Sequence, residues 1–199
     1  MKKFLVFLCA ILLVFGVAGT ASATLINGGF ESGDFTGWTT YVPSGGSANV
    51  VTGHSIWGPL EGTYFALLKT DGPGSYTTLS QSISLNTGDV LSGWAAFDDN
   101  DYVGDNAYVK IYDSGGSLAA TPWYWNDSYG NSAWTEWSWT ASASDTYTLK
   151  LGIANALDSI YDSYALFDAT GVAPVPEPAT MLLLGSGLIG LGIFGRKKR

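Results

Sequence analysis

The chain has 199 residues and a net charge of −8 at pH 7, from nine basic and seventeen acidic side chains. The imbalance is larger between residues 24 and 174, where three lysines stand against sixteen acids and the net charge is near −13. A surface of this sign repels phosphate backbones and attracts divalent cations, so the composition argues against a nucleic-acid partner. The length of this acidic part is that of a single domain.

The first 23 residues have the three parts of a secretory signal peptide. Two lysines precede an apolar run over residues 4–17, and the small residues Ala21-Ser22-Ala23 follow it. We expect signal peptidase to leave a mature chain that begins at Thr24. The only cysteine, Cys9, lies in the apolar run, so the mature chain is expected to fold without disulfides.

Residues 24–174 alternate between apolar and polar side chains, which predicts half-buried antiparallel strands. The clearest strands are expected at 76–85, 106–113 and 146–153. Others are expected at 38–42, 48–52, 64–69, 90–97, 134–140 and 164–168. Short segments rich in Gly, Asn, Asp and Pro separate them. Eight or more short strands at this spacing predict an all-β fold, an antiparallel β-sandwich or jelly roll.

Short motifs along this region resemble those of galactose-binding-like jelly rolls, the fold of many carbohydrate-binding modules. Asn27-Gly28-Gly29-Phe30-Glu31, followed by Gly37-Trp38, is similar to the opening of that fold. Residues 61–67 resemble its third strand and residues 164–168 its closing strand. The resemblance implies this fold for residues 24–174, and it names no ligand.

The same resemblance implies a structural calcium ion that ties the first strand to the last. Glu31 and Asp168 match the positions of its two carboxylate ligands. Calcium takes six to eight oxygen ligands, so backbone carbonyls and another side chain would complete the site. The alternative is that Glu31 is a solvated loop residue and Asp168 a turn residue.

A second candidate for metal binding is the acidic stretch 98–106, with Asp99, Asp101 and Asp105 as ligands. Alternate Asp and Asn side chains in a loop can converge on calcium. The stretch lacks the spacing and the bidentate Glu of an EF-hand, however. The alternative is a loop that joins two strands at the rim of the sandwich, with its acids in solvent.

Aromatic side chains crowd into residues 123–139. Sugar rings present apolar faces to such side chains, so Trp123, Tyr124 and Trp125 are candidates for a carbohydrate-binding surface. The alternative is packing. In that case Trp137 and Trp139 fill the sandwich, because they share one face of the predicted strand 134–140. Trp134 lies on the opposite face of that strand. Trp123 and Trp125 then cover an edge of the sandwich.

The sequence offers no catalytic constellation. His54 is the only histidine and is interpreted as a loop residue, and no Gly-x-Ser-x-Gly motif is present. The many acids leave a glycosidase pair open in principle, but no pair stands out. We therefore expect a protein that is not an enzyme.

The C-terminal segment begins with Val175-Pro176-Glu177-Pro178. An apolar, glycine-rich run over residues 179–194 and a basic end of Arg196, Lys197, Lys198 and Arg199 follow. The apolar run is long enough for a short transmembrane helix, and the basic end is expected to stay cytoplasmic. The two prolines keep the preceding tetrapeptide extended and accessible at the membrane surface.

This tail, residues 175–199, resembles the PEP-CTERM sorting signal of Gram-negative bacteria, through Pro176-Glu177-Pro178, the apolar helix and the basic terminus. The resemblance implies cleavage by an exosortase-type membrane protease. The protein would lie in the inner membrane transiently, then at the cell surface or in the extracellular matrix. The alternative is a plain tail anchor with a Pro-rich linker.

Together these features predict an exported surface protein, a calcium-stabilised jelly roll with a structural or adhesive role in exopolysaccharide or biofilm. The alternative functions are a carbohydrate-binding module with a specific glycan ligand and, in a different class, a glycoside hydrolase. Loss of saturable glycan binding in Trp125→Ala would favour the module.

The sorting hypothesis makes a direct prediction for Pro176→Ala/Pro178→Ala. If a protease recognises the extended tetrapeptide, the double variant keeps its C-terminal segment and stays with the membrane fraction. Immunoblots of cell fractions follow the size and location of the product. Continued release of a shortened ectodomain would contradict the hypothesis.

Overall fold

The computed structural model describes residues 23–70, 72, 74–100, 104–155, 157 and 160–173. The predicted signal peptide up to residue 22, the whole predicted sorting signal and Asp101 lie outside these residues. Among the described residues, no helix has the length and apolar character needed to cross a bilayer.

Across the described ranges the chain forms ten strands, one short 3-10 helix and no α-helix. The strands are β1 (Thr39–Tyr41), β2 (Ser47–Val51), β3 (Phe65–Lys69), β4 (Thr77–Leu85), β5 (Val90–Asp98), β6 (Asp105–Tyr112), β7 (Leu118–Asn126), β8 (Thr135–Thr140), β9 (Asp145–Asn155) and β10 (Tyr164–Ala173), and the 3-10 helix is η1 (Asp127–Tyr129).

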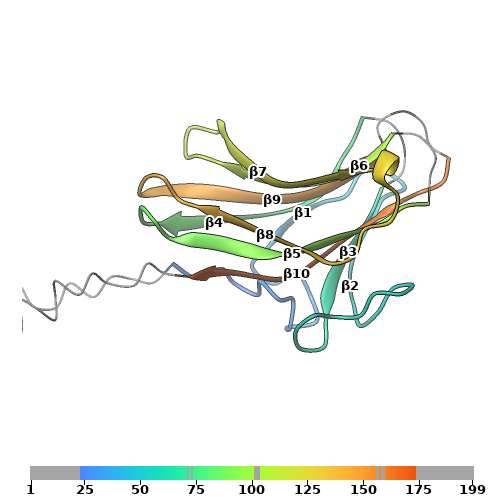
Figure 1. Cartoon of the computed structure of the whole chain (residues 1–199), viewed down its shortest axis with the longest axis horizontal. Coiled ribbons are helices and arrows are strands. Elements are labelled where there is room, and N and C mark those ends of the chain that lie inside the picture. Colours follow the sequence, from blue (N-terminus) through green and yellow to red (C-terminus); the bar gives the residue numbers. More distant parts are fainter. Residues whose placement is uncertain are drawn as a thin grey trace, which may run out of the picture.

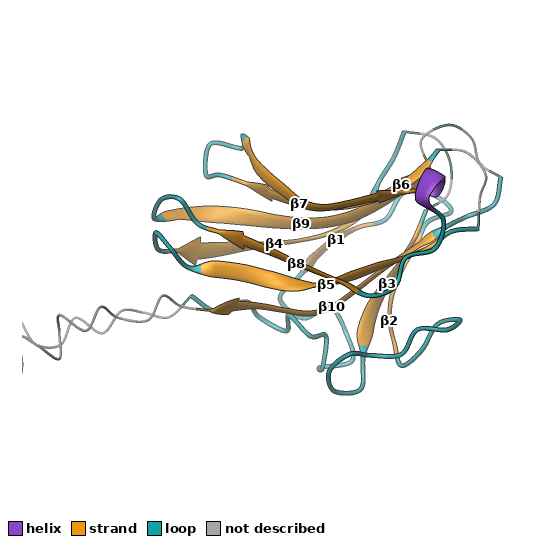
Figure 2. Ribbon diagram, viewed as in Figure 1, coloured by secondary structure: helices purple, strands orange, loops and turns teal. Residues whose placement is uncertain are grey.

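The strands make two five-stranded sheets that lie face to face (Figures 1 and 2). One has the order β1-β4-β9-β6-β7 and the other β2-β3-β10-β5-β8, and we name them the β9 sheet and the β10 sheet after their central strands. All neighbouring pairs in both sheets are antiparallel. The predicted antiparallel β-sandwich is thus confirmed.

The pleat of each strand explains why these segments pair as they do. In β9, Leu149 and Leu151 are fully buried, whereas Thr148 and Lys150, which alternate with them, are half-buried on the opposite face. The same alternation runs through β4 from Leu79 onward and through the end of β6 from Val109 onward. Since successive side chains of a strand point to opposite faces, one face of the β9 sheet covers the core and the other meets solvent.

The sequence pattern does not predict β7, which lies at the edge of the β9 sheet. Its outer positions Leu118 and Tyr124 are exposed, so the apolar alternation is weak. The strand also contains Pro122, and its register against β6 shifts between Val109 and Ile111. Proline lacks an N–H for the ladder and is tolerated at edges and bulges, which is where it stands here.

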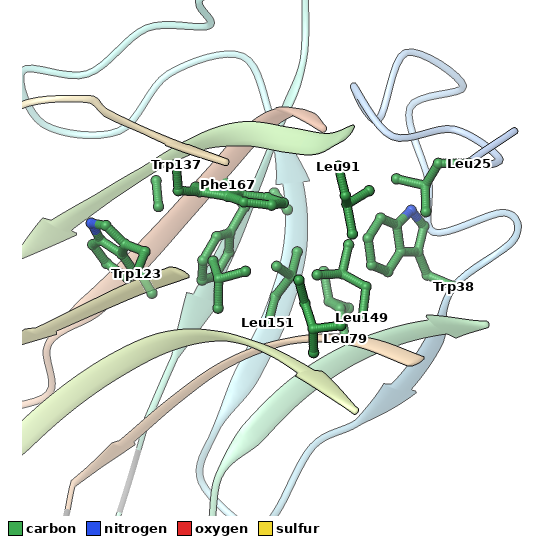
Figure 3. Close-up of a cluster of buried hydrophobic side chains, with 14 of the residues drawn as sticks. Leu25, Trp38, Leu79, Leu91, Trp123, Trp137, Leu149, Leu151 and Phe167 are labelled. Carbon is green, nitrogen blue, oxygen red and sulfur yellow. The ribbon is translucent and has the colours of Figure 1, made fainter. Parts of the chain in front are cut away.

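The core lies between the two sheets (Figure 3). Leu79, Leu149 and Leu151 of the β9 sheet meet Leu91 and Phe167 of the β10 sheet, and all five side chains are fully buried. Full burial of one such side chain stabilises the fold by about 1.5–3 kcal/mol. This packing has to hold the described domain together without disulfides, since residues 24–174 contain no cysteine.

The N-terminal loop closes one side of the core against the last strand. The N–H of Thr170 donates to the carbonyl of Gly28 at 3.1 Å. A Cβ at position 28 would lie 1.8 Å from the carbonyl oxygen of Thr170, so only glycine permits this approach. The contact falls at an irregularity in β10 between Asp168 and Gly171, where Ala169 has a φ of 48°.

This close approach predicts that Gly28→Ala is strongly destabilising. The new methyl group meets backbone rather than a movable side chain, so we expect a loss at the upper end of the about 1–3 kcal/mol typical of overpacking. Gly171→Ala is the matched control, because a Cβ there meets nothing within 4 Å. Urea unfolding followed by tryptophan fluorescence measures both. Equal stability of the two variants would contradict the proposed role of Gly28.

Candidate functional site

Asp168 lies at the start of the irregularity in β10 and is fully buried. One carboxylate oxygen accepts the N–H groups of Leu60 and Glu61 at 2.7 and 3.3 Å, and the other accepts the N–H of Ala169 at 2.6 Å. Burial raises the pKa of Asp168 above its ordinary value, although these three N–H groups act in the opposite direction.

Glu31 reaches the same loop from the N-terminal segment. Its carboxylate accepts the N–H of Thr63 at 3.0 Å and that of Tyr64 at 3.0 Å. Gly62 makes room for it, because a Cβ there would lie 2.3 Å from the Glu31 carboxyl carbon. The N-terminal loop and the last strand are therefore both joined to residues 60–64, and we call this arrangement the carboxylate clasp.

The two carboxylates of the clasp are close enough to influence each other. The negative charge of Glu31 contributes to the raised pKa of Asp168. Both groups supply the hard oxygen ligands that calcium prefers. Over the described part of the chain, no three His, Cys, Asp or Glu side chains gather to hold a metal ion, so a cation at the clasp would need backbone oxygens as further ligands.

The second group of candidate metal ligands is divided among different neighbours. Asp105 is fully buried, and its carboxylate accepts the N–H of Ser163 at 2.9 Å. At Asp99 the backbone N–H donates to the side-chain oxygen of Asn131 at 2.7 Å. Asp101 lies outside the described residues. Both described members thus tie the rim of the sandwich to separate loops.

His54 has a partner that sequence reasoning did not identify. Its Nε2 lies 2.9 Å from a carboxylate oxygen of Asp98, and its ring lies 4.5 Å from that of Tyr164. The pair is 44 residues apart in the chain. No local motif signals a contact over that separation, so only the folded chain reveals it.

The structure divides the aromatic segment of β7 between two faces. Trp123 is 5% exposed and packs edge-on against Phe167 in the core (Figure 3). Trp125, on the same face, is half-buried and donates its indole N–H to the carbonyl of Gly130 at 2.7 Å. Tyr124, which is 49% exposed, is the member of the three that faces solvent. Trp123 therefore offers no surface to a ligand.

The two tryptophans of β8 and Trp134, which precedes β8, lie as the packing alternative predicts. Trp137 is buried in the core between the sheets, and Trp139 packs against the same core. Trp134 lies on the opposite face, with its ring 5.7 Å from that of Phe65. These indoles serve the interior and the edge of the sandwich.

The outer face of the β9 sheet, turned away from the core, carries an open hollow of about 510 Å³. Its lining includes hydroxyl side chains from the adjacent strands β4 and β9, and the full set is Ser80, Ser82, Thr146, Thr148, Tyr112, Lys150 and the hairpin residues Asp113, Ser114 and Gly116. A second hollow of about 350 Å³ shares Ser80, Ser82 and Thr148 with it. We call the larger one the outer hollow.

Two tyrosines extend the same face beside the outer hollow. The rings of Tyr76 and Tyr108 lie 5.0 Å apart, and the Tyr76 hydroxyl donates to the side-chain oxygen of Asn106 at 2.9 Å. Burial raises the pKa of both tyrosines above the ordinary value. Tyr76 is half-buried and Tyr108 nearly fully buried, so both rings pack against the sheet beside the hollow.

Sequence reasoning placed several of these residues correctly on exposed faces but did not bring them together. The strand patterns assign Ser80, Thr148 and Tyr112 to polar faces. They become neighbours because Ser82 pairs with Thr148 and Thr148 with Tyr112 across three strands that are not consecutive. No signal in one strand indicates this order.

Comparison with solved structures places the described sandwich among β-sandwich modules. It is similar to TmCBM61, a carbohydrate-binding module solved with beta-1,4-galactotriose, with 16% identity, a TM-score of 0.54, and coverage of 75% of this chain and 97% of that one. It is also similar to the K3 and K1 adhesin domains of Lys-gingipain from Porphyromonas gingivalis W83, each with 14% identity and a TM-score of 0.52. The K3 match covers 76% of this chain and 99% of that domain, and the K1 match 74% and 96%. At such identities the likeness establishes the fold.

The C-terminal segment has a match of its own. Residues 174–199 match the family model of the PEP-CTERM protein-sorting motif. The chain therefore carries this motif behind its β-sandwich, as the tail sequence predicts. No curated protein matches the chain.

Proposed function

We propose that the protein is exported, cleaved by an exosortase-type membrane protease at its PEP-CTERM motif, and retained at the cell surface or in the extracellular matrix. There its β-sandwich adheres to polysaccharide through the outer hollow. The sorting motif at residues 174–199 supports the first step. The observation that carries the second step is the outer hollow itself, an open concavity with several hydroxyl side chains on the free face of a sheet.

The lining of the outer hollow suits a sugar chain. Four hydroxyl side chains, Ser80, Ser82, Thr146 and Thr148, provide donors and acceptors for sugar hydroxyls. Tyr112 adds an aromatic ring against which a sugar face can stack. The volume lies within the range of about 300–1,000 Å³ that is usual for ligand sites.

The proposal contains no catalytic step. Glycoside hydrolysis generally requires two carboxyl groups that flank the scissile bond. The outer hollow is lined by one, Asp113, whose carboxylate accepts the N–H of Ser117 at 2.8 Å. Adhesion or a structural role in a polysaccharide matrix therefore suits this surface better than turnover does.

Glycan binding predicts a specific effect of Tyr112→Ala. Loss of the aromatic face should weaken binding about three- to tenfold, which corresponds to the about 0.5–1.5 kcal/mol of an aromatic contact. Affinity electrophoresis in gels that contain single polysaccharides measures the effect. Tyr129→Ala is the control, because Tyr129 is 63% exposed on η1 and does not line the outer hollow. Equal binding by both variants, or a larger loss in Trp125→Ala, would place the site elsewhere.

We further propose that calcium binds at the carboxylate clasp and stabilises the fold. Asp168 is buried and its pKa is raised by desolvation and by the charge of Glu31. A divalent cation held by these two carboxylates and by backbone oxygens would offset that repulsion. It would also join the N-terminal loop to the last strand in a domain without disulfides.

The calcium proposal predicts a higher Tm with calcium than with chelator at equal ionic strength. At a calcium concentration about a hundred times Kd, the stabilisation is about 2.7 kcal/mol, or several degrees. Glu31→Gln and Asp168→Asn should abolish the shift, and Glu136→Gln, an exposed residue of β8, should retain it. An identical Tm in both buffers would contradict calcium binding.

The pH dependence supplies a second measurement of the same prediction. The pKa of Asp168 is higher in the folded protein than its ordinary value of 3.8, so protonation of Asp168 stabilises the fold. This stabilisation is complete at pH values below 3.8 and is lost as the pH rises through the folded pKa. Calcium requires the ionised carboxylate, so its effect on Tm should grow over that same interval. A calcium shift that is independent of pH there would argue against Asp168 as a ligand.

A further inference from the structure

Two lysines stand side by side on the outer face of the β9 sheet. Lys110 of β6 and Lys150 of β9 are direct partners in the antiparallel register. Val109, Ile111, Leu149 and Leu151 beside them are fully buried, so both lysines point away from the core. Lys150 lines the outer hollow. The only other basic residue between 24 and 174, apart from His54, is Lys69.

This arrangement carries an energetic cost that no ion pair offsets. Like charges directly opposite each other on neighbouring strands are destabilising. Neither lysine forms an ion pair with any residue that the structure describes. Lys69, by contrast, lies 2.6 Å from a carboxylate oxygen of Asp162. The two uncompensated lysines of a strongly acidic domain are therefore adjacent.

The residues that flank the lysine pair on the adjacent strands β4 and β7 are uncharged. Lys150 faces Ser80 across the β4 pairing. On the other side, the register shift of β7 places Thr121 and Pro122 alongside Lys110. Asp113 also lines the outer hollow, but its carboxylate accepts the N–H of Ser117.

Tyr108 holds Lys110 in position. The Lys110 ammonium lies 4.1 Å from the centre of the Tyr108 ring, within the range of a cation–π contact. The ring itself is nearly fully buried and packs over Gly152, where a Cβ would lie 2.7 Å from the ring carbon Cζ. Because Gly152 has no side chain, the Tyr108 ring can lie against the sheet. In that position it holds the ammonium group of Lys110.

We propose that Lys110 and Lys150 form an anion-binding subsite of the outer hollow, and that the polysaccharide it takes carries carboxylates, as a polyuronate does. The inference rests on the proposed glycan binding and adds the class of glycan. Lysines on two directly paired residues can both donate charge-assisted hydrogen bonds to one carboxylate. The hydroxyl groups of Ser80 and Thr148 contact the same sugar chain.

The negative charge of the whole domain does not prevent this binding at physiological salt. Exposed charges are screened beyond about 8 Å at 0.15 M ionic strength, whereas the lysines act at contact distance. The same charge makes a nucleic acid unsuitable. Its binding depends on neutralising many phosphates, and two lysines among sixteen acids supply too few positive groups.

The test uses the full chain in non-ionic detergent and isothermal titration calorimetry at 0.15 M NaCl. The ligands are alginate, polygalacturonate and glucuronan, each compared with its own carboxyl-reduced, neutral counterpart of equal length. The linkage is the same within each pair, so any difference in affinity comes from the carboxylate. We expect at least one polyuronate to bind tenfold or more tightly than its reduced form, with a preference that falls at 0.5 M NaCl.

The variants separate this inference from glycan binding in general. Lys110→Gln/Lys150→Gln should lose the tenfold preference and bind the reduced polymer within twofold of the wild type. Lys69→Gln, which removes a lysine outside the outer hollow, should keep the preference. The double variant relieves the repulsion between the lysines but also loses the contact of Lys110 with Tyr108, so its Tm should stay close to that of the wild type, which shows that it folds.

Equal affinity for a polyuronate and its reduced form, or a preference that survives in the double variant, overturns the acidic-glycan inference and leaves neutral glycan binding in place. Failure of every polymer, acidic or neutral, to bind overturns the proposed glycan-binding function and this inference with it.

Discussion

The backbone contact between Gly28 and Thr170 determines how this sandwich is closed. It brings the N-terminal loop onto the irregular part of β10, where Asp168 is turned into the residue 60–64 loop. Glu31, three residues after Gly28, is then directed at the same loop. A domain without cysteine thus joins its two ends by a steric fit and by carboxylates that accept backbone N–H groups. These hydrogen bonds are strong because the acceptor is charged.

The pleat of the β9 sheet lets the same strands build the core and the candidate site. Leu149 and Leu151 anchor the inner face, and their immediate neighbours Thr148 and Lys150 belong to the outer hollow. The rigidity of the site comes from the packing behind it. A binding surface on strands is also more precisely held than one on loops, which suits recognition of an extended, repetitive polymer.

Charge distribution connects the sandwich to the surroundings that the sorting motif implies. Most of the domain is acidic, which favours solubility and attraction of divalent cations. The two lysines that face solvent without an acidic partner lie together on one face of one sheet. The proposed adhesion to an acidic polysaccharide needs such a local exception, because a uniformly acidic surface would repel the polymer.

The aromatic residues show the limits of composition as a guide to function. A dense group of Trp and Tyr resembles a sugar-binding surface, yet Trp123 and Trp137 are buried and Trp125 is half-buried. Burial of large aromatic side chains is their commonest use in a small sandwich core. The aromatic residue at the outer hollow, Tyr112, comes instead from a strand that shows only ordinary alternation.

The sequence by itself determined the all-β class, nine of the strands and the sorting motif, because these depend on alternation of period two or on a short contiguous signal. It also marked Glu31 and Asp168, through motifs at the two ends of the domain. Only the tertiary structure decided that β4, β9 and β6 are adjacent, that β7 exists at the edge, and that Lys110 stands opposite Lys150. Strand order and register arise from contacts between residues far apart in the chain, and local pattern carries no record of them.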